Sequence, residues 1–305
     1  MINKDFKTIL ELINTFPDEE SCIEHLESLR WEDGIVISPF DAESKVYACK
    51  GNRYKCKNTG KYFNVKTSTL FDNTKVKLQK WFLAIWLITS HKKGISSVQL
   101  SKDIGVTQKT AWFMLHRIRN CFGFDNDNDL TGEVEVDETY MGGKNKNRHN
   151  SKKVKHSQGR STKDKAPVFG AVQRGGKLNA KHVSDVGMRT LTNEIVSCVS
   201  DATIYSDEWL GYKSLKRIYD HKHVKHGNGE YVNGKIHTNT IEGFWSQLKR
   251  GIFGIYHFTS VKHLQNYVDE FVFRYNTRKG NEVDRFNLLL KNTARRLTYE
   301  DLINA

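Results

Sequence analysis

With 305 residues, the chain is long enough for two or three domains with cores of their own. Its net charge of +13 and pI near 9.4 favour a polyanionic partner, because release of counterions from nucleic acid is the strongest physical use of such an excess; charge kept only for solubility is the alternative. Five cysteines without a Cys-X-X-Cys pair argue against a disulfide framework, the start lacks the apolar core of a secretion signal, and the most apolar stretch, 81–89, is too short to cross a bilayer. We therefore expect a cytoplasmic, nucleoid-associated protein with no membrane partner.

Residues 1–75 are expected to form a first domain of helices and a small β module. Apolar residues at helical spacing predict a helix over 6–13, and Pro17 separates it from a second short helix that ends near Gly34. With glycines at the turns between them, short β-like pieces follow at 45–47, 53–55 and 62–65.

Residues 76–124 carry the pattern of a helix-turn-helix DNA-binding domain. A helical period begins at Leu78, a second capped helix follows, and after a turn at Gly105 a longer helix begins at Thr107. The side chains expected to face outward on this last helix are donor-rich and suit base edges and phosphates: Gln108, Lys109, Thr110, Phe113, His116 and Arg117.

Beyond a polar linker at 125–129, residues 130–280 alternate strands and helices in an order that predicts a mixed α/β sheet flanked by helices. The expected strands are 133–139, 167–174, 178–183 and 202–206. The expected helices are 190–199, 209–218, 240–250 and 261–277. Residues 281–305 are expected as a carboxy-terminal tail.

A basic insertion at 143–165 holds nine Lys or Arg residues and one Asp, which indicates a mobile loop rather than a packed element. We expect it to follow DNA phosphates, through residues such as Lys144, Lys152 and Lys153, and to lose affinity steeply with salt. A solvated loop without a partner is the alternative.

Three acidic residues in apolar contexts, Asp137, Asp207 and Glu242, suggest a metal site built to cut or join nucleic acid. The two aspartates end expected strands, and the glutamate opens an expected helix. Each also has an ordinary alternative: a solvated sheet face for the first, a helix N-cap for the second, and a capping box with Asn239 for the third.

The strand face of Asp137 also carries Glu133 and Glu135, and such carboxylates repel one another unless a cation compensates. Two Mg²⁺ or Mn²⁺ ions, roughly 3.5–4 Å apart, would do so while activating an attacking oxygen and stabilising a leaving one. Asp137 would bridge both ions, and Asp207 and Glu242 would each hold one.

A basic residue accompanies the third acid. Lys249 follows Glu242 by two helical turns and therefore points the same way. It would hold a DNA phosphate near the site, with Arg250 beside it as a further DNA contact. An ordinary surface lysine is the alternative.

Five segments strongly resemble the bacterial insertion-sequence transposases of the IS1595 (ISXO2-like) family: 81–85, 106–118, 134–144, 205–208 and 237–246. The resemblance runs from about residue 20 to residue 280. It implies an RNase H-like catalytic domain with a DDE triad, in which the three acids above are the catalytic carboxylates and Lys249 is the basic residue that follows the third. His237 and Asn239 match positions beside the triad and are secondary candidates.

Transposases of this family usually carry a zinc ribbon with two Cys-X-X-Cys pairs before the helix-turn-helix, and here the sequence departs from that pattern. The aligned positions are Ser38, Asp41, Cys56 and Thr59. One thiolate of four remains, and Ser and Thr are poor zinc ligands. We therefore expect no structural zinc. The degenerate, ribbon-like module would instead rest its core on Tyr47, Tyr54, Tyr62 and Phe63.

Together these features predict a DNA transposase that binds terminal inverted repeats, hydrolyses the 3′ ends and joins them to target DNA. By the resemblance, pairing of two ends implies a homodimer or larger assembly on double-stranded DNA. A non-catalytic, domesticated helix-turn-helix DNA-binding protein is the alternative. A structure-specific nuclease of the same fold, which would cut without joining, is a third reading.

Overall fold

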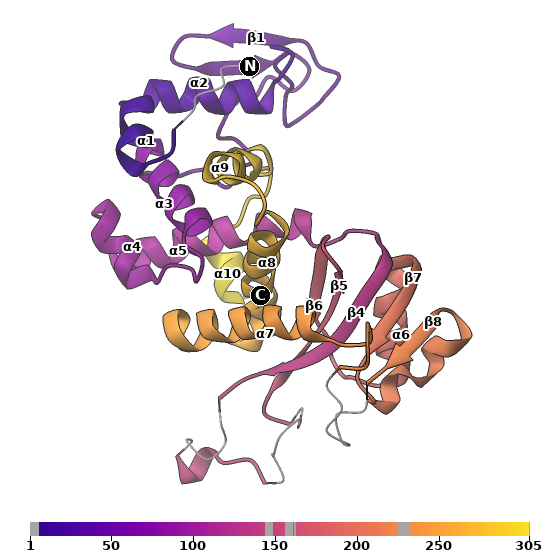
Figure 1. The fold of residues 1–305 in the computed structure, drawn as a ribbon. Coiled ribbons are helices and arrows are strands. Elements are labelled where there is room, and N and C mark those ends of the chain that lie inside the picture. The colour runs from indigo at the N-terminus through magenta and orange to yellow at the C-terminus, as the bar shows by residue number, and fades with distance from the viewer. Residues whose placement is uncertain (1–5, 144–148, 156–160, 162, 225–231, 305) are drawn as a thin grey trace. The chain divides into compact units, whose positions relative to one another are not determined.

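The computed structural model describes residues 6–143, 149–155, 161, 163–224 and 232–304 (Figure 1). The chain divides into two compact units, which we call unit 1 (Met1–Phe122 with Lys279–Ala305) and unit 2 (Gly123–Arg278). Within the described part of the chain, every helix is too short or too polar to cross a bilayer.

The helical part of unit 1 is built around a cluster of aromatic rings. Its outer helices are α1 (Ile9–Thr15), α2 (Glu19–Arg30) and α9 (Glu282–Lys291). Asp18 begins α2 with a capping box that it forms with Ser21, which satisfies backbone donors at the helix start. The buried rings meet mostly edge to face at centroid distances of 4.9–6.4 Å, as aromatic pairs prefer: Phe6, Phe16, Phe82 and Phe286.

Three further helices of unit 1 follow the pattern expected from the sequence: α3 (Leu78–Ser90), α4 (Ser97–Ile104) and α5 (Gln108–Arg119). The hydroxyl of Ser96 caps α4, and that of Thr107 caps α5. Between them, Gly105 adopts φ +60°, the left-handed conformation that ends a helix at lowest cost in glycine. Residues 281–305, expected only as a tail, form α9 and α10 (Tyr299–Asn304).

Unit 1 also holds an antiparallel amino-terminal sheet, in the order β1 (Val46–Cys49), β2 (Arg53–Cys56), β3 (Tyr62–Phe63). Its inner face buries Cys56 and Phe63, and the Tyr54 ring packs 5.2 Å from that of Trp31. The expectation that Tyr47 and Tyr62 belong to the core is wrong, because they are 43% and 55% exposed. In strands, alternate side chains point to opposite faces, and both tyrosines lie on the outer one.

In the described residues of unit 2, five strands form one mixed sheet in the order β6-β5-β4-β7-β8. The strands are β4 (Leu130–Met141), β5 (Ala166–Gln173), β6 (Leu178–His182), β7 (Val199–Ser206) and β8 (Asp220–His223). The first three in this order pair antiparallel, whereas β4, β7 and β8 run parallel. The prediction of a mixed α/β sheet is confirmed, and β8 is an additional edge strand.

Helices cover both faces of this sheet (Figure 1). On one face lie α6 (Met188–Cys198) and the 3₁₀ helix η4 (Leu210–Arg217); on the other lie α7 (Asn239–Gly251), which continues as the π-helix η6 (Ile252–Tyr256), and α8 (Val261–Asn276). Val134 and Val136 of β4 face α6. By the period of two, Glu135 and Asp137 therefore face α7.

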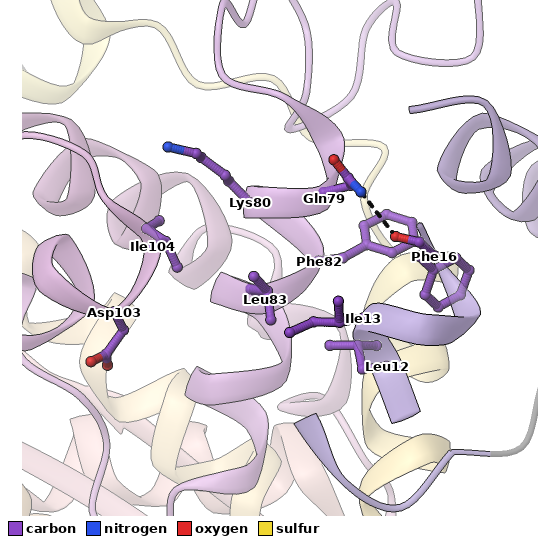
Figure 2. A pocket seen from close by; sticks show the side chains of 9 residues that line it. All are labelled: Leu12, Ile13, Phe16, Gln79, Lys80, Phe82, Leu83, Asp103 and Ile104. Carbon is purple, nitrogen blue, oxygen red and sulfur yellow. Dashed lines mark hydrogen bonds between the residues drawn. The ribbon is translucent and has the colours of Figure 1, made fainter. Parts of the chain in front are cut away.

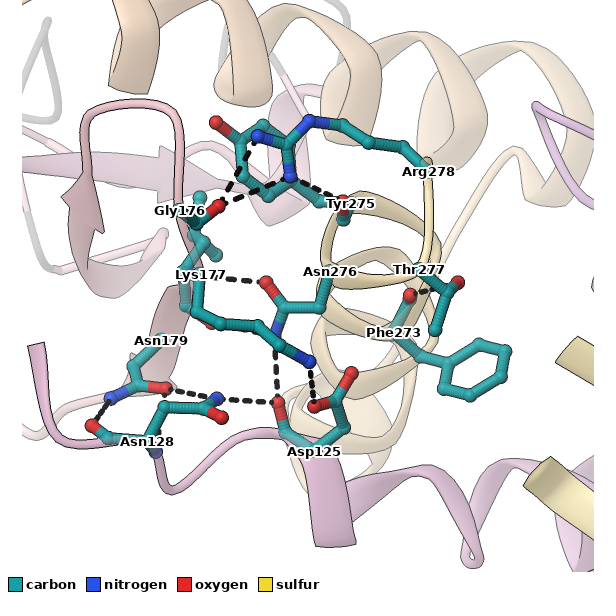
Figure 3. Close-up of polar contacts among 11 residues, drawn as sticks. Asp125, Asn128, Gly176, Lys177, Asn179, Phe273, Tyr275, Asn276, Thr277 and Arg278 are labelled. Atoms are coloured by element: carbon teal, nitrogen blue, oxygen red, sulfur yellow. Dashed lines mark hydrogen bonds and ion pairs between the residues drawn. The ribbon is translucent and has the colours of Figure 1, made fainter. Parts of the chain in front are cut away.

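A polar network fixes one end of α8 to the edge of the sheet (Figure 3). Asn276 accepts a hydrogen bond from the Leu178 N–H and donates to the carbonyl oxygens of Leu178 and Asp125. Lys177 pairs with the Asp125 carboxylate at 2.8 Å. These contacts join the turn before β6, the short 3₁₀ helix η1 (Phe122–Asp125) and α8, and they hold the scaffold on which α7 rests.

Candidate active site

The strand register brings Asp137 and Asp207 together. In the parallel pair of β4 and β7, Glu135 lies opposite Tyr205. Two residues further along each strand, Asp137 is level with Asp207, which follows the last residue of β7. Neighbouring strands lie about 4.8 Å apart, so the two carboxylates start from adjacent backbone positions. Two acids that are 70 residues apart in the sequence are thus brought together where β7 ends. The expectation that Asp137 also ends a strand is wrong, because β4 continues to Met141 and Asp137 still pairs with Gly170 of β5.

Asp137 is a half-buried acid among other acids. Burial raises the pKa of its carboxyl well above the ordinary value, and the negative charges of Glu138 and Asp207 raise it further. Hydrogen bonds from the backbone N–H of Glu138 and from the indole of Trp245 oppose that rise in pKa. The Trp245 Nε1–H donates to Asp137 Oδ2 at 3.0 Å. Two further carboxylates, those of Glu138 and Asp207, thus lie close enough to Asp137 to act on its charge.

Asp207 is 8% exposed, and its Oδ1 accepts the backbone N–H of Trp209 at 2.9 Å. The helix N-cap alternative for Asp207 is not realised, because η4 begins at Leu210 with Trp209 as its N-cap and without a side-chain cap hydrogen bond. The Asp207 carboxylate instead closes the short turn before that helix, while its charge still acts on Asp137. Closing this turn is compatible with a place in an acidic site.

Glu242 and Lys249 face the same cavity as Asp137. This cavity has a volume of about 480 Å³, and the side chains of Asp137, Glu242, Trp245, Lys249 and Lys165 line it. Glu242 is exposed, and its Oε1 accepts the hydroxyl of Thr238 at 2.8 Å. Helix α7 begins at Asn239, so Asn239 is not its N-cap, and no capping box with Glu242 forms there.

Lys249 is half-buried on the face of α7 that carries Glu242, as the two-turn spacing predicts. Burial lowers the pKa of its ammonium; the charge of Asp137 raises it and that of Lys165 lowers it further. The cavity is thus lined by acidic side chains and by the ammonium groups of two lysines. A phosphodiester is the kind of ligand that such a mixed lining suits, provided that a cation neutralises the acids.

The three acids fit a hard divalent cation in chemistry but are not gathered into one ready-made cage. Among the described residues, no group of three or more His, Cys, Asp or Glu side chains is placed to hold a metal ion. The charges of Glu138 and Asp207 nevertheless act on Asp137, and carboxylate oxygens are the ligands that Mg²⁺ prefers. The exposed side chain of Glu242 has other rotamers available to it.

Comparison with known proteins decides the family. A model described as the ISXO2-like transposase domain matches residues 129–276, which span the five strands and α6 to α8. A curated relative from Halobacterium salinarum, an uncharacterized protein in the transposable element ISH50, is 32% identical over 253 residues, covering 78% of this chain and 84% of the relative. The chain belongs to the IS1595 (ISXO2-like) transposase family.

Two solved structures were also found to be similar to this member of the family. The Mos1 strand transfer complex shares 8% identity and covers 70% of this chain and 74% of its own, with a TM-score of 0.29. A pre-cleavage Mos1 transpososome shares 10% identity and covers 71% and 80%, with a TM-score of 0.25. At such scores neither likeness assigns a fold or a site to the ISXO2-like chain.

Sequence reasoning did not find the contacts that Glu135 makes beside the candidate site of this ISXO2-like chain. Glu135 is fully buried and accepts Nε–H of Arg174 at 2.7 Å. Its carboxylate also accepts the N–H groups of Thr240 and Ile241 and the Thr240 hydroxyl, at 2.8–3.1 Å. The carboxylate therefore fastens the first turn of α7 to β4, two residues from Asp137. The only signal in the sequence was the need for a cation beside three carboxylates on one strand face.

The secondary candidates, His237 and Asn239, differ in their surroundings. His237 Nδ1 lies 3.2 Å from Glu135 Oε1, and the His237 carbonyl accepts a hydrogen bond from Arg174 at 2.9 Å. His237 thus joins Glu135 and Arg174 in the set of contacts that positions α7, which we call the clamp. Asn239 is exposed in the first turn of α7.

The DNA-contact candidates on α5 divide into two groups. Gln108 and Lys109 are exposed at the start of the helix, and Thr110 is half-buried. His116 and Arg117, expected to face outward, are 1% and 6% exposed, so that expectation is wrong. The buried stripe of α5 widens toward its end. Arg117 there donates to the carbonyl of Asp72 at 2.6 Å, and its guanidinium lies over two aromatic rings, those of Trp81 and Phe113.

The remaining basic candidates lie in unit 2. Arg250 is exposed on α7, and Lys153 is exposed just after the short 3₁₀ helix η3 (Asn150–Lys152). Lys152 ends that helix, and Lys144 lies outside the described residues.

Unit 1 has a cavity of its own, of about 260 Å³, beside α1, α3 and α4 (Figure 2). Most of its lining is apolar, and the Gln79 side chain donates to the Phe16 carbonyl at 3.1 Å. Asp103 is the one acid among its lining residues, so this cavity lacks the paired carboxylates of the site in unit 2.

Proposed function

We propose that this chain is a DNA transposase that binds the terminal inverted repeats of an insertion sequence and catalyses metal-dependent 3′-end cleavage and strand transfer. The observation that carries the proposal is a cavity lined by Asp137, Glu242 and Lys249. Asp207 is not among the residues that line it, but it follows the parallel strand next to Asp137, and its charge acts on that carboxyl. Unit 2 would then be an RNase H-like catalytic domain. Its sheet order and its helices on both faces support that reading.

Asp137, Asp207 and Glu242 would hold two Mg²⁺ or Mn²⁺ ions, which, when bound, supply the neutralising charge that lets an attacking oxygen approach a phosphodiester. Asp137 is oriented for this role by the hydrogen bond from Trp245, and Asp207 by the hydrogen bond from the Trp209 N–H. Glu242 would give up its hydrogen bond with the Thr238 hydroxyl and turn its carboxylate toward the other two acids. The clamp of Glu135 and Arg174 keeps α7, and with it Glu242, seated on β4.

Lys249 and Lys165 would hold the DNA backbone at this cavity. Lys249 is half-buried beside acids, so its ammonium is better placed to bind a phosphate close to Asp137 than a fully solvated lysine is. Arg250 and Lys153, both exposed, would follow the backbone farther from the reacting phosphate.

The reaction would consist of two in-line displacements at phosphorus. In the first, water attacks the scissile phosphate and the 3′-oxygen of the transposon end leaves, taking a proton to become a free 3′-OH. In the second, that 3′-OH attacks a phosphate of target DNA and the target's own 3′-oxygen leaves. Neither step needs a covalent enzyme intermediate, since each bond that breaks is replaced by one bond to the incoming oxygen.

In unit 1, α3, α4 and α5 would act as a helix-turn-helix that reads the terminal repeats. Gln108, Lys109 and Thr110 lie at the amino-terminal end of α5, the part of a recognition helix that reaches base edges. Residues 1–75 would form amino-terminal helices and a degenerate zinc-ribbon-like module, followed by the DNA reader at 76–124. The catalytic domain would occupy residues 130–280, with the basic insertion at 143–165, and residues 281–305 would be a helical tail. Because two transposon ends must be paired, the active form would be a homodimer or larger assembly on DNA.

The decisive test is Asp207→Asn in the full chain. We expect wild-type protein to nick and join a duplex that carries the terminal repeat when Mg²⁺ or Mn²⁺ is present, and the variant to bind that duplex equally well without cutting it. Glu208→Gln, the adjacent acid, is the matched control and should keep activity. Binding without any nicking by wild-type protein would establish the non-catalytic reading, and nicking without joining would establish a nuclease.

A further inference from the structure

The outer face of the amino-terminal sheet carries tyrosines and basic side chains. The register pairs Tyr47 with Lys55 and Lys55 with Tyr62, so these three residues form one row across the strands. Arg53 lies on the same face two residues before Lys55, and Lys45 lies two residues before Tyr47. None of the residues of β1, β2 and β3 is acidic. The face is therefore aromatic and cationic together.

Packing of the sheet does not require these rings. Tyr47 is 43% exposed and Tyr62 is 55% exposed, whereas Phe63 on the other face is buried. Each exposed ring instead has cations beside it: Lys45 Nζ lies 5.5 Å from the Tyr47 centroid, and Arg53 Cζ and Lys55 Nζ lie 5.6 and 5.5 Å from that of Tyr62. Two large rings are thus presented to the outside among positive charges.

We propose that this face binds single-stranded DNA, with bases stacked on Tyr47 and Tyr62 and phosphates held by Lys45, Arg53 and Lys55. Cations alone would suffice for the phosphates of a duplex, whose base faces are stacked on one another and out of reach. Exposed rings add affinity only where bases are unpaired, and every base has a face that can stack. The two rings are two strand spacings apart, about 10 Å, so each would take a separate base. The proposal takes DNA as its ligand from the proposed function and is otherwise independent of catalysis.

The test measures binding of a fluorescent oligodeoxythymidylate to the full chain by anisotropy at several salt concentrations. We expect Tyr47→Leu and Tyr62→Leu each to weaken binding by roughly tenfold with an unchanged salt dependence. Tyr62→Phe, which keeps the ring, should bind as wild type does. Lys55→Gln should weaken binding and also reduce the slope of log K against log salt by about 0.7, the share of one phosphate on a single strand.

The matched control is Tyr299→Leu on α10, a tyrosine that is 40% exposed with Lys109 Nζ 5.3 Å from its ring centroid. This variant should keep wild-type affinity for the oligonucleotide. Unchanged binding by Tyr47→Leu and Tyr62→Leu would overturn the proposal, as would an equal loss in the Tyr299 variant. Retained binding to the duplex repeat shows that each variant is folded. If the leucine variants do not fold, the proposal is overturned by an unchanged slope of log K against log salt in Lys55→Gln.

Failure of the proposed function gives a different pattern. Asp207→Asn protein should bind the oligonucleotide normally, because Asp207 belongs to unit 2. If wild-type protein never nicks DNA, the proposed transposase activity is wrong, but the measured binding of the oligonucleotide is unaffected.

Discussion

Trp245 donates its indole N–H to Asp137 over 3.0 Å, which joins helix α7 to strand β4 at the first acid of the site. Room for the indole comes from the neighbouring strand. Gly170 of β5 pairs with Asp137, and a Cβ at that position would lie 2.6 Å from Cη2 of Trp245. The absence of one methyl group on β5 therefore lets a helix reach the carboxylate on β4.

Gly170→Ala should push the indole away from Asp137. We expect a loss of about 1–3 kcal/mol in the free energy of unfolding, since an added methyl overpacks the core, together with a changed tryptophan fluorescence. Gly243→Ala on α7 is the control. It has nothing within 4 Å of its added Cβ, and alanine favours a helix, so it should leave stability unchanged or raise it by up to about 1 kcal/mol. Equal stabilities of the two variants would contradict the packing argument.

Replacing Arg174 alone should lower the free energy of unfolding more than replacing Arg174 and its charged partner Glu135 together. Arg174→Met leaves Glu135 charged and buried, which costs about 3–5 kcal/mol. The double variant with Glu135→Gln has no buried charge and keeps an oxygen for the N–H groups at the start of α7, so it should recover part of that loss. Urea unfolding of the wild type, both single variants and the double variant measures the coupling.

An exposed ion pair of the same unit serves as the comparison. Lys181 and Glu194 lie 2.9 Å apart, and the lysine side chain is 61% exposed. Lys181→Met should change stability by less than about 1 kcal/mol. If Arg174→Met lowers the free energy of unfolding by no more than Lys181→Met does, the buried pair of Arg174 and Glu135 does not hold α7.

The amino-terminal sheet should grow more stable as pH rises through the range in which Cys56 ionises. Burial raises the pKa of this thiol, but hydrogen bonds from Ser38, Ser44 and Thr59 outweigh burial and lower the pKa to about 6. In the unfolded chain the thiol titrates near 8.5, so the unfolded state binds more protons between these values. The stabilisation is complete above the unfolded pKa and is lost as pH falls through about 6.

Cys56→Ser should flatten this dependence, as followed by unfolding of the wild type and the variant across that pH range. Cys49→Ser, at the end of β1, should keep it. Metal analysis of the same protein, purified without tags, adds the second readout. We expect no stoichiometric zinc; its presence would mean that a metal, rather than three hydroxyl-bearing side chains, holds the thiolate.

Sequence patterns predicted the strands and helices of unit 2 well because its interior is built on period-two and helical spacing. Strand β8 was missed because Asp220–His223 contains no apolar residue; as an edge strand, it is held by pairing with β7. Helices α9 and α10 were also missed. The first has apolar residues at helical spacing, including Val283, Phe286 and Leu290, so its signal was present in the sequence.

The three candidate acids were singled out from two expected strand ends and one expected helix start, and Asp137 proved to lie inside β4 rather than at its end. The neighbours of these acids were not predicted. The register between β4 and β5 decides that Arg174 compensates the charge of Glu135 and that Gly170 leaves room for Trp245. Local sequence does not contain this register. The same limit explains Arg117. Helical spacing predicts the centre of a buried stripe but not its width, which is set by the elements packed against it.

Arg117 and Lys109, both candidates for DNA contact on α5, should respond in opposite ways. Arg117→Met removes a buried guanidinium that holds the Asp72 carbonyl, so it should lower the melting temperature and leave the duplex affinity of the folded protein unchanged. Lys109→Gln, at an exposed position, should leave stability within about 0.5 kcal/mol. It should also weaken binding to the terminal repeat and reduce its salt slope by about 0.9, the share of one duplex phosphate. Thermal unfolding and salt-dependent anisotropy on both variants separate the two effects. A reduced salt slope for Arg117→Met at full stability would restore that arginine to the DNA surface.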